Sequence, residues 1–436
     1  MRRLIAVAIA FLAVARLVAA ASQPSEAPAG FDDASNGAAS ESTHVADRKT
    51  FDDVETVEDG LGPLYNAQSC RECHQNPVSG GASQVNELRV GHLGPDGRFQ
   101  NPSIPIARGT VVITGRSLVN DRAICPSSAA PDTEIQERVP ESEHIRTRRI
   151  SLNVLGDGFV EAVADSTFLA LAREQRRSSG GRIRGQVLMV PIVESPGKTG
   201  VGRFGWKDQH ASVLSFCGDA YLNEMGITSR LFPDEVTTVC NDASEPNDKP
   251  GADGLDDVDR FARFIRATMA PARDTVLAGT ALARRGSRLF DRIGCVSCHV
   301  RTLTTAPAGT KLHGGRYAIP AVLGGRSFHP FGDFLLHDVG TGDGIVMAVQ
   351  EHYGRTMEQY KWNNFSTGAF QTTQYRVRTA PLWGVRLRTR LMHDGASVTL
   401  GDAVRRHGGE AKDAARQFKA LPAADQEALL EFLRSL

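Results

Sequence analysis

The stretch Gly294-Cys295-Val296-Ser297-Cys298-His299 determines how the rest of this chain is organised. The C-x-x-C-H pattern is the attachment site of a c-type haem, because two thiols three residues apart can form thioethers to the two vinyl groups on one porphyrin edge, while the next residue places an imidazole beneath the iron. A second copy is Cys70-Arg71-Glu72-Cys73-His74. A zinc knuckle, a disulfide or a redox pair could also use a lone Cys-x-x-Cys. Two copies of the full pattern favour two covalently bound c-type haems, with His74 and His299 as proximal ligands.

The composition sets limits on the class of protein. The chain has 436 residues, enough for two or three domains. Basic and acidic residues number 50 each, and this balance does not indicate binding to nucleic acid or to a membrane surface. The 43 glycines and 21 prolines, beside only three tryptophans and six tyrosines, indicate a loop-rich protein whose interior is partly filled by something other than side chains.

The N-terminus has the pattern of an export signal. Met1-Arg2-Arg3 is followed by an apolar run from Leu4 to Val18 and then by three alanines, which is the order of regions in a secretory signal peptide. The run is shorter than the roughly 20 apolar residues of a membrane span. We therefore expect residues 1–21 to be a cleaved signal peptide, and the mature protein to be periplasmic without a stable membrane span. Residues 22–50, rich in Ala, Ser and Asp, are expected to be a flexible leader.

The two haem motifs belong to an internal repeat. A Leu-aromatic pair, Leu64-Tyr65 in one copy and Leu289-Phe290 in the other, begins six residues before the first thiol, and a glycine stands shortly before each pair. Leu255–Thr268 and Ala423–Leu436 both carry apolar residues at i, i+3, i+4 and i+7, the period of an amphipathic helix. Each unit is predicted to be a short helix leading into C-x-x-C-H, a loop-rich middle and a closing helix.

The predicted fold is mainly α, with two cytochrome c-type domains that have long loops and an inserted region containing minor β structure. The N-terminal haem domain is expected over residues 51–272, with an insertion at about 126–200, and the C-terminal haem domain over residues 273–436. Residues 126–150 are polar and indicate a surface excursion. The apolar period after Gly158 indicates a helix that ends at Ser178–Gly181, and Gln186–Glu194 is the one convincing strand-like run.

Three cysteines lie outside the haem motifs: Cys125, Cys217 and Cys240. In an oxidising compartment we expect one disulfide and one free thiol, but the sequence does not say which two residues pair.

An acidic loop follows the third of these cysteines. The carboxylates of Asn241–Asp257 could hold Ca²⁺, although a solvated loop explains them as well.

Several stretches resemble the di-haem oxidoreductase family, which is related to the bacterial di-haem cytochrome c peroxidases. Together they span roughly residues 51–436 in the family's order. They are Gly60–Ala67, Leu155–Glu161, Gly202–Lys207, Asn223–Thr228, Leu335–Gly340, Arg378–Gly384, Leu391–Gly395 and Thr399–Glu410. The resemblance implies an oxidoreductase of the peroxidase type.

The resemblance also implies a sixth ligand for each iron. The position after the His393-Asp-Gly turn that supplies the ligand of the C-terminal haem corresponds to His407, which would make that haem bis-histidine and low-spin. A plain capping role for His407 at the end of a helix is the alternative. For the first haem, the candidate is His92, eighteen residues past His74.

Other residues are matched to the peroxidase machinery by the same resemblance. Glu224 resembles the acid near the peroxidatic haem, where a carboxylate can move a proton between the two peroxide oxygens; otherwise it is a solvated helix residue. Trp206 resembles the tryptophan between the haems and could assist electron transfer; otherwise it is a core aromatic. His337 and His393 are expected to support haem propionates or the domain interface.

Two functions follow. In the first, the C-terminal haem takes electrons from a small soluble donor, such as a cytochrome or a cupredoxin, and passes them to the N-terminal haem, where peroxide or a related oxidant is reduced. In the alternative, both irons are six-coordinate, with His92 and His407 as ligands, and the protein is an electron carrier without peroxidase turnover. A haem-binding sensor has no positive feature in the sequence.

Overall fold

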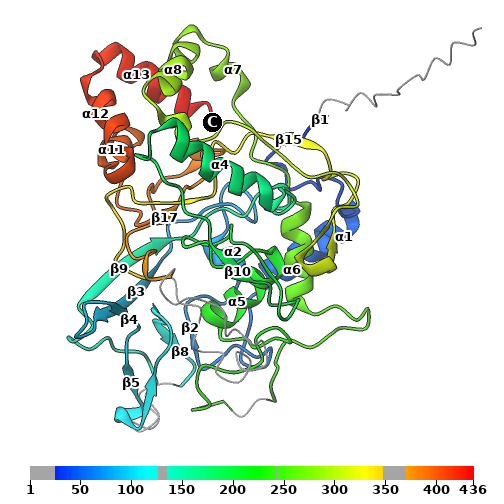
Figure 1. The fold of residues 1–436 in the computed structure, drawn as a ribbon. Coiled ribbons are helices and arrows are strands. Elements are labelled where there is room, and N and C mark those ends of the chain that lie inside the picture. Colours follow the sequence, from blue (N-terminus) through cyan, green and yellow to red (C-terminus); the bar gives the residue numbers. More distant parts are fainter. Residues whose placement is uncertain (1–24, 126–134, 242–243, 347–369) are drawn as a thin grey trace, which may run out of the picture.

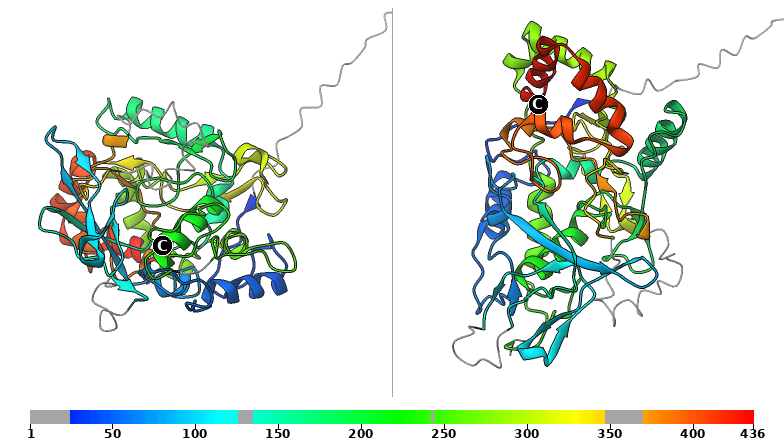
Figure 2. Two further views of the ribbon diagram at one scale, coloured as in Figure 1. Left: turned by 90° about the horizontal axis from the view of Figure 1, so that it is seen from below. Right: turned by 90° about the vertical axis from the view of Figure 1, so that its left-hand side faces the viewer.

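The computed structural model describes residues 25–125, 135–241, 244–346 and 370–436. The predicted signal peptide lies outside the described residues. Helices of the C-terminal third gather at one end of the molecule, and the strands of residues 86–150 gather at the opposite end (Figures 1 and 2). No helix among the described residues is both long enough and apolar enough to cross a membrane.

The prediction of a mainly α fold is wrong. The structure is 32% helical and 16% strand, and its strands form seven small sheets within the described residues. The largest has the order β4-β3-β7, with β9 also paired to β3. β3 (Asn86–Leu93) and β9 (Ile145–Ile150) run antiparallel from Asn86↔Ile150 to Gly91↔Ile145. β3 alternates charged with apolar residues, and in β9 only the two end residues, Ile145 and Ile150, are apolar, so neither strand is an apolar run. The expected surface excursion at residues 126–150 in fact ends in a strand.

Two helix pairs carry the internal repeat. α1 (Glu41–Asp52) packs on α6 (Asp257–Ala267), and α8 (Ala281–Arg292) packs on α13 (Ala423–Arg434). The closing helices α6 and α13 confirm the helices expected there. The α8–α13 crossing is close, because a Cβ added at Gly286 would lie 1.8 Å from the carbonyl oxygen of Ala428.

The flexible leader is a wrong prediction for residues 25–50. The N-cap Ser40 begins α1, where its side chain accepts a hydrogen bond from the N–H of Thr43. The buried Asp47 pairs with Arg263 of α6 at 2.6 Å, and His44 stacks on Phe264 at 5.1 Å between ring centroids. The polar composition therefore hides a helix that is fixed by caps and buried polar contacts rather than by an apolar run.

The repeat aligns differently from the sequence-based expectation. No helix leads into the first motif; the segment before it contains β2 (Leu64–Tyr65), and α1 is the helix that corresponds to α8. Phe51 of α1 lies 6.3 Å from the ring of His74, and Phe290 of α8 lies 6.4 Å from His299, both with an interplanar angle of 52°. The longer connection between Phe51 and Cys70 conceals this equivalence in the sequence.

Elements in the middle of the chain contribute to the walls of the cavity described below. The helix predicted after Gly158 is two helices, α3 (Asp157–Glu161) and α4 (Asp165–Ser178), and the second ends where expected. The strand-like run contains β10 (Met189–Pro191), which pairs with β11 (Thr199–Val201). α5 (Val213–Met225) then packs on α6. The division of the chain at residues 272–273 stays a prediction.

The remaining elements are short. The helices are α2 (Cys70–Cys73), α7 (Thr275–Ala278), α11 (Leu400–Arg406) and α12 (Lys412–Ala420). The strands are β1 (Ser25–Glu26), β4 (Phe99–Gln100), β5 (Ile104–Ile106), β6 (Val111–Ile113), β7 (Leu118–Val119), β8 (Arg122–Ala123), β12 (Leu303–Thr304), β13 (Lys311–Leu312), β14 (Tyr317–Ala318), β15 (Arg326–Phe328), β16 (Leu336–His337) and β17 (Val377–Arg378).

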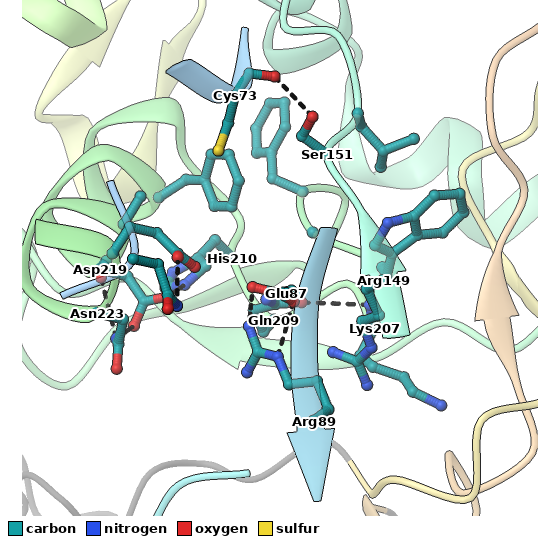
Figure 3. Close-up of a pocket in the computed structure, with 18 of the residues that line it drawn as sticks. Cys73, Glu87, Arg89, Arg149, Ser151, Lys207, Gln209, His210, Asp219 and Asn223 are labelled. Carbon is teal, nitrogen blue, oxygen red and sulfur yellow. Dashed lines mark hydrogen bonds and ion pairs between the residues drawn. The ribbon is translucent and has the colours of Figure 1, made fainter. Parts of the chain in front are cut away.

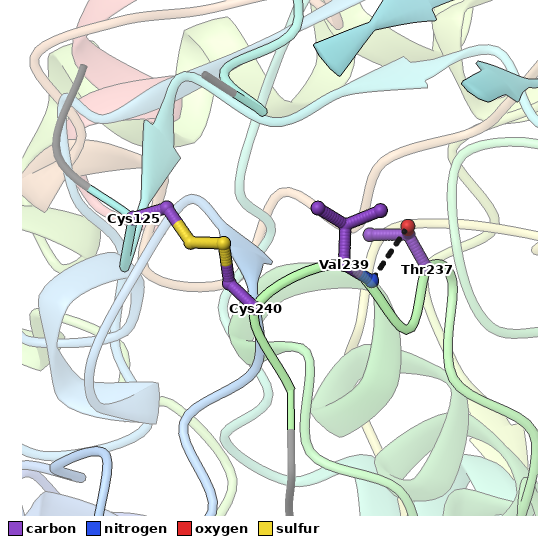
Figure 4. Close-up of a disulfide and its surroundings, with 4 residues drawn as sticks. All are labelled: Cys125, Thr237, Val239 and Cys240. Carbon is purple, nitrogen blue, oxygen red and sulfur yellow. Dashed lines mark hydrogen bonds between the residues drawn. A yellow bond between two sulfur atoms is a disulfide. The ribbon is translucent and has the colours of Figure 1, made fainter. Parts of the chain in front are cut away.

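The cysteines outside the haem motifs form one disulfide and leave one thiol, as expected. Cys125 is bonded to Cys240, with 6.2 Å between their Cα atoms (Figure 4). Cys217 is a free thiol buried on α5.

Candidate haem sites and the adjoining cavity

The second motif faces a second imidazole. His299 donates from Nδ1 to the carbonyl of Phe331 at 2.9 Å, and His407 donates from Nδ1 to the carbonyl of Ala403 at 2.8 Å. Each Nε2 lone pair is therefore left for a metal, which is the usual arrangement of a ligating histidine. Their ring centroids are 6.4 Å apart.

This separation suits one metal held between the two rings. Two imidazoles that bind a metal from opposite sides, with bonds of about 2.0–2.1 Å, have their centroids about 6 Å apart. Burial lowers the pKa of His299 to about 4 and also lowers the pKa of His407, so both are neutral, the form that binds a metal. His407 is also the C-cap residue of α11, so the capping role and the ligand role are compatible.

The four motif cysteines, Cys70, Cys73, Cys295 and Cys298, are free thiols in the structure. They are therefore available for the attachment of two haems. Neither motif forms a disulfide in the structure.

A zinc site at the second motif has one candidate group. Ligand atoms of Cys298, Asp333 and His337 lie within 4.8 Å of one another, the single such group among the described residues. His337 contacts Asp333 at 3.0 Å and Glu410 at 2.9 Å. Burial opposes its charged form, but Asp333 and Cys298 together outweigh burial and hold the pKa of His337 well above its ordinary value. A protonated imidazole does not bind a metal, so this group suits an ion-pair network better than zinc.

The first motif opens into a cavity of about 400 Å³. Cys73 and His74 line it, and burial lowers the pKa of His74 to about 4. The opposite walls come from β3, β9, α5 and residues 204–210 (Figure 3). A haem attached at Cys70 and Cys73 fits this arrangement, because a neutral imidazole borders an internal space at the attachment site.

Two carboxyl groups of different charge lie on the wall of this cavity. Glu87 of β3 forms a bidentate pair with Arg89, at 2.7 and 3.0 Å; burial would raise its pKa, but Arg89 lowers it. Burial, and then the charge of Glu87, raise the pKa of Glu224 to about 8. Near pH 7 the proton of the pair therefore belongs to Glu224, which hydrogen-bonds to Glu87.

The structure brings Glu224 and Trp206 to the same cavity as His74. Trp206 is 8% exposed and donates from Nε1 to the carbonyl of Ile150 at 2.7 Å. Its ring lies 6.1 Å from the ring of His393, edge to face. Glu224 is therefore not the solvated helix residue of the alternative interpretation, whereas Trp206 is both a buried aromatic and a cavity residue.

His92 is not brought together with His74. It lies near the far end of β3, where its Nδ1 is 2.8 Å from the carboxylate of Glu143, and it is not one of the described residues that line the cavity. Its role as a haem ligand stays a prediction without geometric support.

The acidic loop uses its carboxylates locally. Asp248 accepts from the N–H groups of Asp257 and Val258, Asp256 caps α6, and Asp253 pairs with Arg260 at 2.7 Å. These contacts favour the loop interpretation for the described part of residues 241–257, and the Ca²⁺ site stays a prediction.

Sequence reasoning missed several cavity residues. Glu87 and Arg89 alternate with Leu88 and Val90 along β3, and this period-two pattern would have revealed them. His210 also lines the cavity and lies 3.1 Å from Asp219 of α5, whose other oxygen accepts from Asn223 at 3.0 Å. No local pattern marks this second pair, because α5 and residues 204–210 meet only in the folded chain.

The family match agrees with these two centres. Residues 125–436 match the family described as "Di-haem oxidoreductase, putative peroxidase". This span is more than half of the chain, so the protein belongs to the di-haem oxidoreductase family and is an oxidoreductase that holds two haems. The match begins after the first C-x-x-C-H motif, later than the resemblance drawn from the sequence. No curated protein sequence matches the chain.

Solved structures give weaker similarities. Hydrazine synthase of Kuenenia stuttgartiensis is 14% identical, with a TM-score of 0.40 over 100% of both chains. The diheme peroxidase BthA from Burkholderia thailandensis E264 is 18% identical, with a TM-score of 0.25 over 52% of this chain and 59% of that one. A MauG-like protein associated with microbial copper homeostasis is 16% identical, with a TM-score of 0.24 over 41% and 52%. All three TM-scores are below 0.5, too low to establish a common fold.

Proposed function

We propose that this protein is an exported periplasmic peroxidase that carries two covalent c-type haems, on Cys70/Cys73 and on Cys295/Cys298. Hydrogen peroxide is reduced at the N-terminal haem with electrons that enter at the C-terminal haem. The observation that carries the proposal is the asymmetry of the two centres. His74 borders a cavity with an acid pair, whereas His407 fills the space opposite His299.

The acid pair supplies the proton chemistry. The haem, when bound, supplies the two electrons that convert hydrogen peroxide and two protons into two molecules of water. The ionised Glu87 accepts the proton of one peroxide oxygen, and the protonated Glu224 donates its proton to the oxygen that leaves as water. Two carboxyl groups whose surroundings push their pKa values apart are suited to such base and acid roles.

The route between the two centres passes Trp206. Its indole contacts the cavity on one side and the ring of His393 on the other. The backbone of Ile150 links the two, because its carbonyl accepts from Trp206 and its N–H donates to the carbonyl of His393. A rigid aromatic held at both ends suits a fixed electron path.

The electron donor is proposed to be a small acidic protein that docks on the outer face of α8. The inner face of this helix buries Ala283, Gly286, Leu289 and Phe290. At about 100° per residue, the exposed Arg284, Arg288 and Arg292 lie on the opposite face, and the helix ends three residues before Cys295. No carboxylate among the described residues pairs with these three arginines.

The three like charges of this face lower the stability of the helix itself. Like charges at i, i+4 destabilise a helix by about 0.2–0.5 kcal/mol per pair, and Arg284 lies near the positive end of the helix dipole. A surface of this kind attracts an acidic partner from a distance and raises its association rate. We therefore place the donor contact at this arginine face, defined by Arg284, Arg288 and Arg292.

Turnover with peroxide tests the proposed function. The purified, haem-loaded protein is reduced, and oxidation of a reduced dye is followed with and without hydrogen peroxide. We expect oxidation that depends on peroxide. Electron paramagnetic resonance of the oxidised protein is expected to show one low-spin and one high-spin centre. Two low-spin centres together with no peroxide-dependent oxidation would instead identify an electron carrier.

A further inference from the structure

Two buried arginines are held beside Trp206 on the wall of the first cavity. Arg149 precedes Ile150, whose carbonyl accepts a hydrogen bond from Nε1 of Trp206 at 2.7 Å. The backbone N–H of Arg378 donates to the carbonyl of Trp206 at 2.9 Å. Both arginines are 4% exposed, and both line the same cavity as His74. The two guanidinium groups therefore belong to the wall that the first haem would face.

A hydrogen bond fixes Arg149 relative to the first haem motif. The hydroxyl of Ser151 donates to the carbonyl of Cys73 at 2.6 Å (Figure 3). Ser151 and Arg149 are two residues apart in extended chain at the end of β9, so their side chains leave the backbone on the same side, with their Cα atoms about 7 Å apart. Arg149 therefore stands about two strand residues from the attachment site of the first haem.

Each of these guanidinium groups has a buried donor atom that is not used. Nη2 of Arg149 and Nε of Arg378 are buried and have no hydrogen-bond acceptor within the described chain. Their neighbouring atoms are engaged, because Nε of Arg149 donates to Asp343 at 2.8 Å and Nη1 of Arg378 donates to the carbonyl of Arg203 at 2.9 Å. A buried N–H without an acceptor is destabilising, so both atoms point to an acceptor from outside the polypeptide.

The charge of Arg149 is only partly neutralised. Arg149 shares the carboxylate of Asp343 with Lys207, and this carboxylate lies 2.8 Å from both cations. One negative charge thus faces two positive charges. Arg116, on the same cavity wall, also has unused donor atoms, but Glu137 at 2.9 Å neutralises its charge one to one.

The charge of Arg378 has no ionised partner. No ion pair joins it to a carboxylate in the part of the chain that the structure describes. The acids that act on it are Asp208 and Asp157. Burial raises the pKa of Asp208 well above its ordinary value and that of Asp157 to about 7, so neither supplies a full negative charge at neutral pH. Arg149 and Arg378 therefore each bring one uncompensated positive charge to this wall.

We propose that Arg149 and Arg378 bind the two propionate carboxylates of the N-terminal haem and turn its propionate edge toward Trp206. A haem carries two carboxylates, as many as the uncompensated charges, and a guanidinium is well suited to pair with a carboxylate in a buried site. The thioethers at Cys70 and Cys73 hold the other edge of the porphyrin. This inference rests on the proposed function, because it takes the N-terminal haem to fill this cavity. Electrons that pass Trp206 then enter the haem at its propionate edge.

Resonance Raman spectroscopy of the haem-loaded protein tests the contact directly, because the propionate-bending band shifts when the carboxylate loses a hydrogen bond. Arg149→Gln and Arg378→Gln are each expected to shift this band. Loss of a positive charge also disfavours the reduced iron, so the midpoint potential of the N-terminal haem should fall. We expect a tenfold smaller equilibrium constant for reduction, which is about 59 mV for one electron. The N-terminal haem is identified as the centre whose potential does not change in His407→Met.

Arg146→Gln is the matched control, since Arg146 is an exposed arginine of the same strand and is not one of the described residues that line the cavity. Its band and potential should stay those of the wild type. If the glutamine variants do not fold, Arg149→Lys and Arg378→Lys keep the charge but not the planar group, and should still shift the band while the potential stays near that of the wild type.

An unchanged band in either arginine variant would overturn the proposal, even with a changed potential, because the guanidinium would then hold another anion. A potential shift confined to the centre that responds to His407→Met would overturn it as well. Peroxide-dependent oxidation of a dye reports separately on the proposed function, because a protein that holds both haems without turnover would still show the band shift.

Discussion

At the scale of single residues, the protonation of Glu224 controls the predicted chemistry. Its pKa of about 8 keeps it protonated near neutral pH, while Arg89 keeps Glu87 ionised. Both groups are thus in the required state below pH 8. As the pH rises through about 8, Glu224 loses the proton that it must donate, so kcat/KM for hydrogen peroxide should fall.

Replacing this proton donor should remove both the activity and the pH dependence. Glu224→Gln is expected to lower kcat/KM for peroxide about 10²-fold or more, the usual contribution of a general acid or base, and to abolish the decline above pH 8. Stopped-flow kinetics across pH 6–9 measure both effects. Glu174→Gln, an exposed glutamate of α4, is the control and should retain wild-type kinetics. A variant with full activity and an unchanged pH profile would exclude Glu224 as the donor.

The ligand pair of the second centre gives a spectroscopic prediction. With His407 as the predicted sixth ligand, His407→Met would replace a bis-histidine centre by a His/Met centre, which has a higher reduction potential. Potentiometric titration of the low-spin haem should therefore show a rise, and its paramagnetic resonance signal should change. His329→Met serves as the control, because His329 is a surface residue bonded to Glu26 at 3.0 Å. An identical signal and potential in the His407 variant would show that another group is the sixth ligand.

At the scale of elements, α8 combines two unrelated tasks. Its inner face fixes Phe290 against His299 and against α13, while its outer face presents Arg284, Arg288 and Arg292 to solvent. Because the two faces are opposite each other, the outer face can be neutralised without disturbing the packing.

Neutralising the arginine face should therefore affect only the protein donor. With Arg284, Arg288 and Arg292 all changed to Gln, kcat/KM for a reduced acidic cupredoxin is expected to fall about tenfold at low salt, while kcat stays near that of the wild type. The dependence of kcat/KM on ionic strength should also become weaker, because salt screens exposed charges over about 10 Å at 0.1 M. Turnover with a small neutral dye should not change.

Two comparisons make this test specific. Arg98→Gln with Arg108→Gln removes two exposed charges near β4 and β5, at the other end of the molecule (Figure 1), and should leave the kinetics with the protein donor unchanged. A basic cytochrome should be a poor donor for the wild type. If the triple variant and the wild type accept electrons from the acidic donor equally well, docking occurs elsewhere.

At the scale of the whole molecule, the Cys125–Cys240 disulfide joins segments 115 residues apart. Closing a loop of this length restricts the unfolded chain, and removing such a bond typically costs about 2–5 kcal/mol. Changing both cysteines to Ser should lower the free energy of unfolding by this amount, as measured by urea denaturation of the haem-loaded protein. Cys217→Ala, which touches no disulfide, should cost less. Equal stability of the double variant and the wild type would show that the bond does not constrain the unfolded state.

The sequence by itself determined the two C-x-x-C-H motifs, the closing helices α6 and α13, the number of disulfides and the family. These features are local: a C-x-x-C-H spacing and an apolar period of 3.6 residues can be read without knowing what lies opposite. The resemblance also led to Glu224, Trp206 and His407, whose surroundings it could not describe.

Only the tertiary structure decided the features that depend on contacts between distant segments. The helix α1 was missed because its stability comes from caps and from contacts with α6, and β3 and β9 were missed because their buried faces carry charge. For the same reason the pairing of Glu87 with Glu224 and the approach of His407 to His299 have no local signal. The C-x-x-C-H motif at Cys295–His299 thus predicts where a haem is attached, whereas the fold decides which groups surround that position.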